Sequence, residues 1–477
     1  MRSPWLTATT LFVALLPAGC GASSAPRPSS DVPADDVRAV ASFLGDVHPA
    51  PYRYVDPATL SQRVDSEVAR LDALQEPTEF DVGLAIHRVL ASVGDGHLAV
   101  AMPSFQPTAG VTLSLVPIMP IRIGARVLVD ATTQDLPAGT ELLAIDGVPI
   151  DDVYQTLAPL VLVDGARDEL RRAGLERGFA RYYPLAFGMR DRYVLRIQEP
   201  GADPRDLTLD GLDRDALGAL VANRRSNALR GGPPLSPPWP TATRHDDAVI
   251  LRLAGFGILD EAEYTRRTDA LFAELSGDET LVLDLRGNEG GLRTNGIAVL
   301  NHVLASPYAQ WQRMDTRIRQ MPDAWRSAVT FPFVPESALT SYFPDDALVR
   351  EGDPLAARMR PHGAGHRGRV LAFIDGATNS AAVEALVALR AARPDALLVG
   401  TETGGECGRH IGELPVQFST PERGFGVLVS LIALTHVPVK GCEPGRGFVP
   451  DAEIALDEAA FLSGRDPYLD ALTALSR

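Results

Sequence analysis

The spacing of hydrophobic positions changes within the first half of the chain. Between residues 36 and 95 they repeat at helical spacing, which predicts a small helical region. One such series comprises Leu60, Val64, Val68 and Leu71. From residue 115 to residue 210 the hydrophobic segments become short, as at 127–129, and Gly and Pro separate them. This part is therefore predicted to contain short strands.

The second half alternates strand-like and helix-like segments. It follows a Pro- and Gly-rich stretch, 231–240, that cannot continue a helix or a central strand. Helices are expected at 260–275 and 381–392, and the irregular segment 307–365 is expected to be a lid or an insertion. Four continuous hydrophobic segments are typical of strands buried on both faces of a parallel sheet: 248–253, 281–285, 370–374 and 396–399. The pattern predicts an α/β fold.

Residues 1–20 have the features of an export signal. Arg2 precedes a mostly apolar stretch, 5–16, that is too short to span a bilayer. It ends in Leu-Leu-Pro-Ala-Gly-Cys20, which resembles the lipobox of bacterial lipoproteins, although Pro17 stands where leucine is usual. The resemblance implies an acylated Cys20 and a membrane-anchored protein of the cell envelope, facing the periplasm or the exterior. The alternative is a cleaved signal with an incidental cysteine.

Charge and composition exclude several classes of protein. The 477 residues include 45 Lys and Arg against 61 Asp and Glu, a net charge of −16, which argues against nucleic acid as a partner. An apolar fraction of 45% excludes wholesale disorder. Lys440 is the single lysine, so mechanisms that need a catalytic lysine have almost no candidate.

Beyond Cys20 there are two cysteines, Cys407 and Cys442, which are expected to form a disulfide if the chain is exported and are otherwise two free thiols.

A serine follows one of the predicted buried strands and directly precedes a predicted helix. Ser380 ends the segment Asp-Gly-Ala-Thr-Asn-Ser after strand 370–374. Such a turn lies at the carboxyl edge of a sheet, and the helix N-terminus behind it offers free N–H groups to a developing oxyanion. Gly290 and Gly291 follow another predicted strand and allow close backbone approach. The simpler interpretation of the same segment is that Ser380 caps the helix.

Several segments together resemble peptidase family S41, the C-terminal-processing or tail-specific proteases, and its tricorn-like branch. The stretch 136–150 resembles a strand and turn of PDZ domains, without their Gly-Leu-Gly loop. The other matching segments are Asp-Val-His-Pro-Ala-Pro-Tyr52, Gly-Asp-Gly-His97, Asp-Leu-Arg-Gly-Asn-Glu-Gly-Gly291, the Ser380 turn, Val-Gly-Thr-Glu-Thr-Gly-Gly405 and Gly-Phe-Val-Pro-Asp451. The resemblance implies a ClpP/crotonase-like α/β core and a peptidase activity.

Within this family the serine is activated by either lysine or histidine, and the sequence favours histidine. Arg409 stands near the place of the family's lysine, and a guanidinium is not a base. The tricorn-like pattern places a histidine at His97 and a glutamate at Glu443, which would orient the imidazole. Two alternatives remain open: Glu402 or Asp95 in place of Glu443, and His410 or His436 in place of His97. The pattern's additional serine is absent, because Gly96 occupies its position.

The resemblance implies hydrolysis of peptide bonds through an acyl-enzyme on Ser380, with oxyanion contacts from Ala381 and from Gly290 or Gly291. The expected partner is a peptide or protein substrate, and no metal or organic cofactor is expected; His362 and His366 are interpreted as loop residues. The alternative is a non-catalytic lipoprotein that binds a peptide or an apolar ligand on the same fold. The expected parts are a signal (1–20), a tether (21–35), a helical region (36–110), a PDZ-like module (111–212), a linker (213–245) and the catalytic domain (246–477).

Overall fold

The computed structural model describes residues 33–101, 114–165, 167–233, 235–454 and 456–475. The predicted export signal with Cys20, and nearly all of the predicted tether, lie outside the described residues. In the part of the chain that is described, no helix is both long and apolar enough to cross a membrane.

Three helices form the N-terminal region, as the helical spacing predicts: α1 (Ala34–Val47), α2 (Pro57–Asp72) and α3 (Glu79–Val93). Asp56 caps α2 by accepting a hydrogen bond from the Thr59 N–H, and Thr78 and Asp81 form a capping box at the start of α3. Gly94 ends α3 in the left-handed conformation with φ 74°, which turns the chain sharply toward His97.

The short strands predicted between 115 and 210 form an antiparallel sheet in the order β2-β3-β4-β6-β7, with β5 paired to β4. The strands are β2 (Pro120–Ile123), β3 (Arg126–Val129), β4 (Glu141–Ile145), β5 (Val148–Pro149), β6 (Arg192–Gln198) and β7 (Arg205–Asp210). The helices α4 (Ile150–Leu157) and α5 (Asp168–Phe187), with the 3₁₀ turn η2 (Ala158–Leu160), share one apolar core with this sheet. The helix α6 (Arg214–Ala222) and the turn η3 (Arg225–Arg230) lead to the next domain.

The core of the second half is a mostly parallel sheet in the order β18-β15-β14-β10-β9-β8. Its strands are β8 (Thr241–His245), β9 (Ala248–Arg252), β10 (Thr280–Asp284), β14 (Val370–Ile374), β15 (Leu397–Gly400) and β18 (Ala452–Glu453). The four predicted strands are found as β9, β10, β14 and β15. The edge strand β8 is antiparallel and arises from the predicted linker.

Helices cover both faces of this sheet. One face packs against α7 (Glu261–Ala273), α8 (Arg293–Val303) and α11 (Ala381–Ala392), and the other against the C-terminal helix α13 (Pro467–Leu475), while α12 (Glu458–Ser463) lies just before α13 in the chain. The motif residue Arg286 is buried at the carboxyl end of β10, where it forms ion pairs with Asp284 and Asp466. A buried guanidinium needs such partners because an unpaired buried charge is costly.

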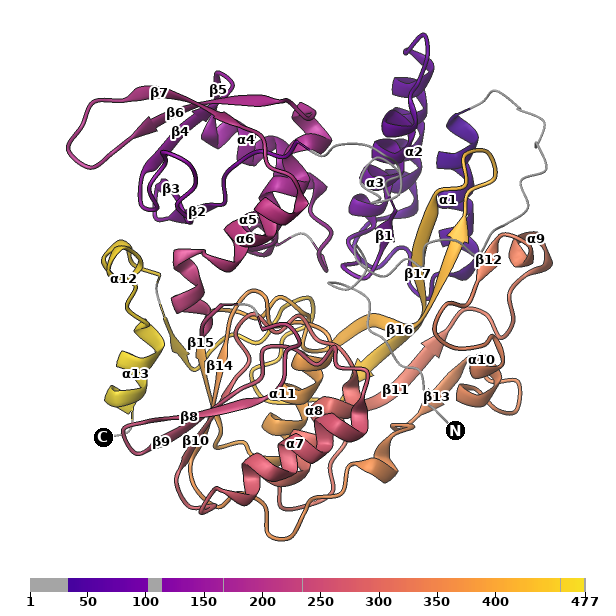
Figure 1. Ribbon diagram of the computed structural model, residues 1–477. Helices are drawn as coiled ribbons and strands as arrows, with labels where there is room; N and C mark the ends of the chain where they lie inside the picture. The colour runs from indigo at the N-terminus through magenta and orange to yellow at the C-terminus, as the bar shows by residue number, and fades with distance from the viewer. Residues whose placement is uncertain (1–32, 102–113, 166, 234, 455, 476–477) are drawn as a thin grey trace.

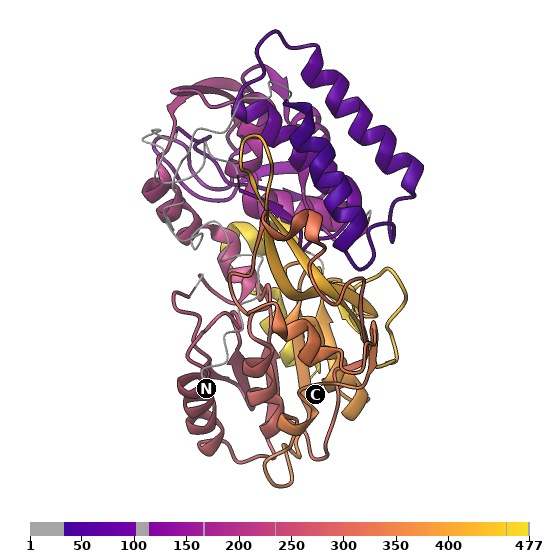
Figure 2. The same ribbon diagram turned by 90° about the vertical axis from the view of Figure 1, so that its right-hand side faces the viewer.

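A third sheet, in the order β12-β16-β17-β11-β13 with β1 added to β17, joins the core domain to the N-terminal helices. Its main part is the long hairpin β16 (Arg409–Ser419) and β17 (Gly426–His436), which extends from the core domain toward α1 and α3 (Figures 1 and 2). The remaining strands are β1 (Ala99–Val100), β11 (Trp311–Thr316), β12 (Val329–Thr330) and β13 (Val349–Glu351). Phe43 of α1 stacks on Phe418 of β16 within a shared core.

The segment 307–365, predicted as a lid or an insertion, contributes three strands to this sheet. It also contains α9 (Asp323–Arg326), α10 (Ser337–Tyr342) and the turn η4 (Ala356–Arg358). Because β11 pairs with both β17 and β13, the segment is an integral part of the third sheet.

Candidate active site

Ser380 lies at the sharp turn between β14 and α11, where the sequence predicted it. Its backbone has φ 50° and ψ −128°, a conformation that L-residues rarely adopt and that costs on the order of 1–3 kcal/mol. The turn is held by Asn379, whose Oδ1 accepts the Ser380 N–H at 2.7 Å. The side chain of Ser380 makes no capping hydrogen bond to the helix, so the simpler interpretation as a helix cap does not describe its geometry.

The glycine loop after β10 is tied to the serine turn by Asn288. Its amide Nδ2 donates to the Leu253 carbonyl, its Oδ1 accepts the Gly290 N–H at 2.9 Å, and its own carbonyl accepts the Asn379 N–H at 3.0 Å. Gly290 then lies so close to the turn that a Cβ at its position would be 2.7 Å from the Ser380 Cβ. Only glycine fits this approach.

Two of the three predicted oxyanion donors have free N–H groups. Neither Ala381, the first residue of α11, nor Gly291 donates its N–H to any described residue. The expectation for Gly290 is corrected, because its N–H is already used by Asn288. Gly290 supplies space beside the serine, whereas Ala381 and Gly291 supply the donors that an oxyanion needs.

His97 reaches Ser380 from the loop after α3. Its Nε2 lies 3.4 Å from the Ser380 Oγ, a long contact of the kind that tightens when substrate binds. Two buried carboxylates hold the loop: Asp95 accepts the His97 N–H at 2.8 Å, and Asp164 accepts the Gly96 N–H at 2.9 Å. Asp164 comes from the β-rich module, so three parts of the chain meet at this site.

Asp95 lies behind the imidazole and is held by a second histidine. Its Oδ1 is 3.7 Å from the His97 Nδ1, while its Oδ2 accepts a hydrogen bond of 2.8 Å from the His48 Nε2. The His48 Nδ1 accepts the Ala50 N–H, so the proton of His48 is on Nε2. The result is a buried series from His48 through Asp95 and His97 to Ser380.

The charges in this series favour a basic His97. Burial alone would lower its pKa, but the carboxylates of Asp95, Asp164 and Glu384 raise that pKa above its ordinary value. Burial likewise opposes ionisation of Asp95, yet the hydrogen bonds with His48 and His97 hold its pKa well below the usual range. The pKa of Asp164 is raised, mainly by burial and partly by the charge of Asp95. The two neighbouring carboxyl groups are thus shifted in opposite directions, the pKa of Asp95 downward and that of Asp164 upward.

The structure does not bring Glu443 to the site. Its side chain is 71% exposed and its carboxylate lies 4.0 Å from Arg446, whereas the His97 side chain is almost fully buried. Glu402 binds Arg167 and Arg446 instead. Of the carboxylates considered from the sequence, only Asp95 lies beside His97. His48 and Asp164 were not identified from the sequence, although His48 belongs to one of the matching segments.

A second buried polar network adjoins the first. The His436 Nδ1 donates to the Cys407 carbonyl at 2.7 Å, so its Nε2 accepts from the His410 Nδ1 at 3.1 Å. The His410 Nε2 then donates to the Glu384 carboxylate, also at 3.1 Å. Burial and the nearby His410 lower the pKa of His436 to about 4. Because His410 donates with both ring nitrogens, it is not placed to take a proton from Ser380, although its ring stacks on that of His97.

Cys407 and Cys442 form a disulfide in the structure, with 5.6 Å between their Cα atoms. The bond joins the segment just before β16 to the loop after β17. Cys407 is therefore both one end of a cross-link and, through its carbonyl, the acceptor for His436.

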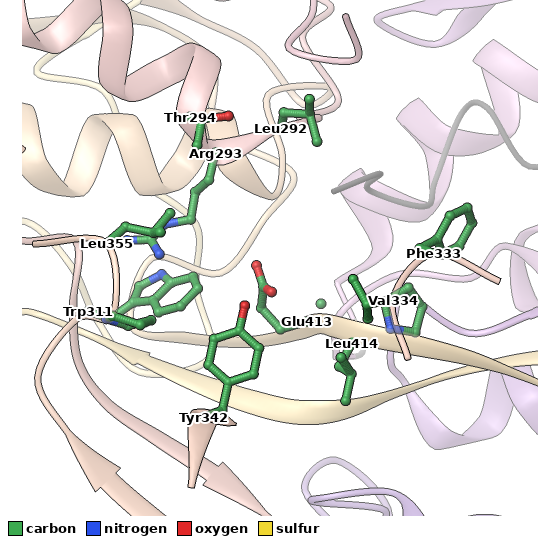
Figure 3. A pocket seen from close by; sticks show the side chains of 13 residues that line it. Leu292, Arg293, Thr294, Trp311, Phe333, Val334, Tyr342, Leu355, Glu413 and Leu414 are labelled. Atoms are coloured by element: carbon green, nitrogen blue, oxygen red, sulfur yellow. The ribbon is translucent and has the colours of Figure 1, made fainter. Parts of the chain in front are cut away.

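A pocket opens beside the reactive groups (Figure 3). The empty space in and in front of it, open solvent included, is about 540 Å³. Leu292, which follows Gly291, forms one wall, and Gly412 forms another, where a Cβ would lie 3.1 Å from the His97 Nε2. The apolar part of the lining comes from Trp311, Phe333, Val334, Tyr342, Leu355, Leu414 and Pro415. The pocket thus adjoins both the glycine loop and His97.

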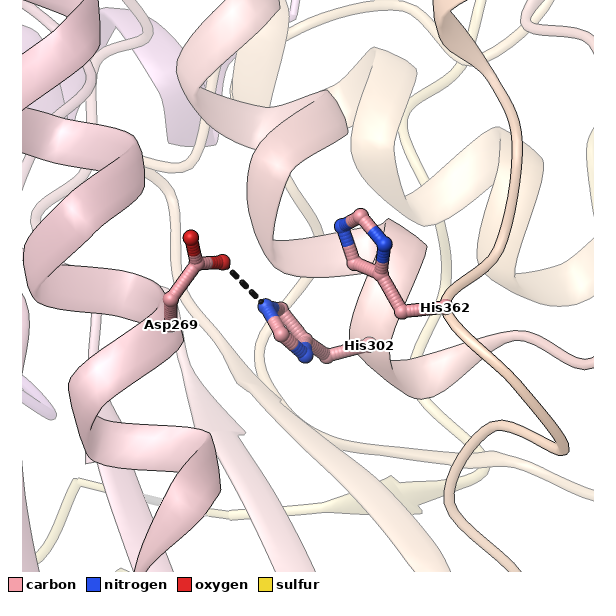
Figure 4. A group of neighbouring side chains, drawn as sticks. All are labelled: Asp269, His302 and His362. Atoms are coloured by element: carbon pink, nitrogen blue, oxygen red, sulfur yellow. Dashed lines mark hydrogen bonds and ion pairs between the residues drawn. The ribbon is translucent and has the colours of Figure 1, made fainter.

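Among the described residues, three groups of side chains have the composition of metal sites. Two are buried, Asp95 with His97 and Asp164, and Glu384 with His410 and His436; Asp95 already bonds to His48, and Glu384 pairs with His410. The third joins Asp269, His302 and His362 on the outer side of α7 and α8 (Figure 4). In it the His302 Nε2 donates to Asp269 at 2.7 Å and the His302 ring stacks on Phe272. His366, also interpreted as a loop residue, bonds to the Glu279 carbonyl.

Comparisons with known proteins agree with the resemblance seen in the sequence. Residues 247–413 match the family model of peptidase family S41, which confirms that resemblance over this part of the chain and supports a peptidase. A search of curated protein sequences finds no match.

Solved structures with the same fold include two of mature CPAF. The structure of mature CPAF complexed with lactacystin is 15% identical, with a TM-score of 0.63, and the alignment covers 93% of this chain and 98% of CPAF. The structure of mature CPAF alone is 16% identical, also with a TM-score of 0.63, over 92% and 96% of the two chains. At this identity the similarity establishes the fold, and it agrees with the predicted α/β class and its N-terminal helices.

Proposed function

We propose that the protein is a serine peptidase that hydrolyses peptide bonds through an acyl-enzyme on Ser380. The observation that carries the proposal is the convergence at one turn of a strained serine, the imidazole of His97 at 3.4 Å and two free N–H groups. A serine hydroxyl is a weak nucleophile until a neighbouring base removes its proton. Here His97 is that base, and Asp95 is the carboxylate that orients it.

The reaction follows from these positions. The His97 Nε2 takes the Ser380 proton as Oγ attacks the substrate carbonyl, and the N–H groups of Ala381 and Gly291 stabilise the oxyanion. The imidazolium, stabilised by ionised Asp95, then protonates the leaving amine. A water molecule, deprotonated by the same imidazole, hydrolyses the acyl-enzyme and frees Ser380.

Labelling with a fluorophosphonate probe, followed by peptide mass spectrometry, tests this function. The wild-type protein is expected to carry the adduct on Ser380, while Ser380→Ala gives none and His97→Ala labels at least about 100-fold more slowly. Glu443→Gln is the matched control, because its exposed carboxylate lies away from the serine, and it is expected to label at the wild-type rate. A folded wild-type protein that takes up no probe would contradict the proposal and favour the non-catalytic binding protein.

We further propose that the peptidase is anchored at the cell envelope through an acylated Cys20. The lipobox-like segment before Cys20 and the apolar stretch 5–16 support this location. Cells grown with an alkyne fatty acid are expected to label the wild-type protein but not a Cys20→Ser variant, which should leave the membrane fraction. Equal membrane retention of both proteins, with no label on either, would contradict the anchor.

A further inference from the structure

The side chain that the pocket receives can be inferred from its one unpaired charged group. The pocket borders both halves of the reactive site, since Leu292 follows an oxyanion donor and Gly412 contacts His97. The space thus adjoins the groups that would surround the attacked carbonyl. Its lining decides which substrate side chain it can hold.

Glu413 is the acidic group in this lining. The pairing of β16 with β17 shifts register between Ile411 and Glu413, and Leu414 has a φ of 54°. Such a bulge redirects the side chains of a strand. Figure 3 shows the Glu413 carboxylate pointing into the space between Trp311, Leu292 and Val334. It forms no hydrogen bond or ion pair with any described residue.

The cation in the pocket lining, Arg293, is already paired with acidic side chains. Arg293 lies over the Trp311 ring and forms ion pairs with Asp353 and with Glu384, while Glu384 also accepts from His410. Arg293 is thus already matched by Asp353 and Glu384, and Glu384 is shared with His410. Glu413 remains as the acid without a counterion, in surroundings that are otherwise mostly apolar.

The raised pKa of Glu413 is consistent with a carboxyl group that lacks a counterion. Burial, and then the charge of Glu384, raise the pKa of Glu413 to about 8, and Arg293 offsets only part of that increase. The titratable and charged groups around it are Arg293, Tyr342, Asp353, Glu384 and His97. A cationic ligand would supply the missing charge and stabilise the ionised carboxylate.

We infer that Glu413 makes the pocket selective for a lysine or arginine side chain on the residue whose carbonyl Ser380 attacks. This inference rests on the proposed peptidase function. The apolar walls accommodate the methylene stem, and the Glu413 carboxylate pairs with the charged end. Glu413 is a specificity-determining group and takes no part in the proton transfers at His97.

The first test compares two peptides that differ only at this residue, one with lysine and one with the uncharged norleucine. The ratio of their kcat/KM values cancels the ionisation of His97, because both reactions share it. We expect the wild-type ratio to favour lysine and to rise with pH through about 8, as Glu413 ionises. In Glu413→Gln, which keeps the shape of the side chain, the ratio should fall about 10- to 100-fold and lose this pH dependence. A wild-type preference for norleucine, or an unchanged ratio in Glu413→Gln, would overturn the inference.

The second test needs no turnover. Binding of benzamidine, an amidinium on an apolar ring, is measured by calorimetry on Ser380→Ala, with neutral benzamide as the control ligand. Benzamidine should bind at least tenfold more tightly than benzamide, and adding Glu413→Gln should remove the difference. If no peptide is cleaved but this Glu413-dependent binding is found, the pocket assignment stands and the peptidase function fails. If benzamidine and benzamide bind alike, the pocket assignment fails, whatever the peptidase does.

Discussion

Replacement of Asp95 by asparagine is expected to lower kcat by about 10³- to 10⁴-fold while leaving the protein folded. The amide is isosteric with the carboxylate, but it has one acceptor oxygen in place of two, so it keeps only one of the two hydrogen bonds that Asp95 accepts, from the His97 N–H or from His48. It carries no charge, however, so it does not stabilise the imidazolium that forms when His97 takes the serine proton. An amide nitrogen beside Nδ1 also favours the wrong tautomer of His97.

The same variant has a pH signature. Activity requires neutral His97, so kcat/KM rises with pH through the pKa of His97. In the wild-type protein that pKa is raised above its ordinary value of about 6.5. Without the Asp95 carboxylate the pKa should fall, and the acidic limb of the profile should move to lower pH even as the plateau drops. Glu443→Gln should leave both plateau and limb in place; the opposite result for the two variants would return the orienting role to Glu443.

Gly290→Ala is expected to reduce kcat/KM by at least about 100-fold, because the added methyl group displaces the nucleophile. Its Cβ would lie 2.7 Å from the Ser380 Cβ and 3.1 Å from the Ala381 N, so the serine turn must shift. A misplacement of reacting groups by about 1 Å can cost a hundredfold in rate. Gly290 also has a φ of 101°, which adds backbone strain to the clash.

A matched variant separates these two effects. Gly287 has a φ of 74°, but a Cβ at its position meets nothing within 4 Å. Gly287→Ala should therefore lose about 1 kcal/mol of stability and keep its activity. Thermal unfolding and peptide hydrolysis measured on both variants check the prediction. Equal activity losses in the two variants would show that strain in the loop, and not contact with Ser380, causes the effect.

The α/β core could be predicted because its strands are buried on both faces and therefore form continuous apolar runs, as at 281–285 and 370–374. The long hairpin β16–β17 was not predicted. Gly412 and Pro415 interrupt β16, the pairing contains a bulge, and Leu414 adopts a positive φ. Irregularities of this kind hide the periodicity of a strand, although here they position the pocket wall.

The candidate site likewise contains residues that could be predicted from the sequence and residues that could not. Ser380 was predictable because a strand, a turn and a helix follow one another locally, and His97 was found through resemblance. The groups that tune His97 have no local pattern. His48 and Asp164 lie 47 residues before and 69 residues after Asp95 in the chain, and only the packing of the helical region against the β-rich module brings them together. Glu443 matched a motif position, yet a surface loop carries its side chain into solvent.

The disulfide between Cys407 and Cys442 lies at one end of a series of contacts that leads to the proposed site. The Cys407 carbonyl holds His436, His436 holds His410, and the His410 ring stacks on that of His97. Thiols stay unpaired in a reducing cytoplasm and pair in an oxidising compartment. In a chain that moves from one to the other, this cross-link therefore forms only after transport.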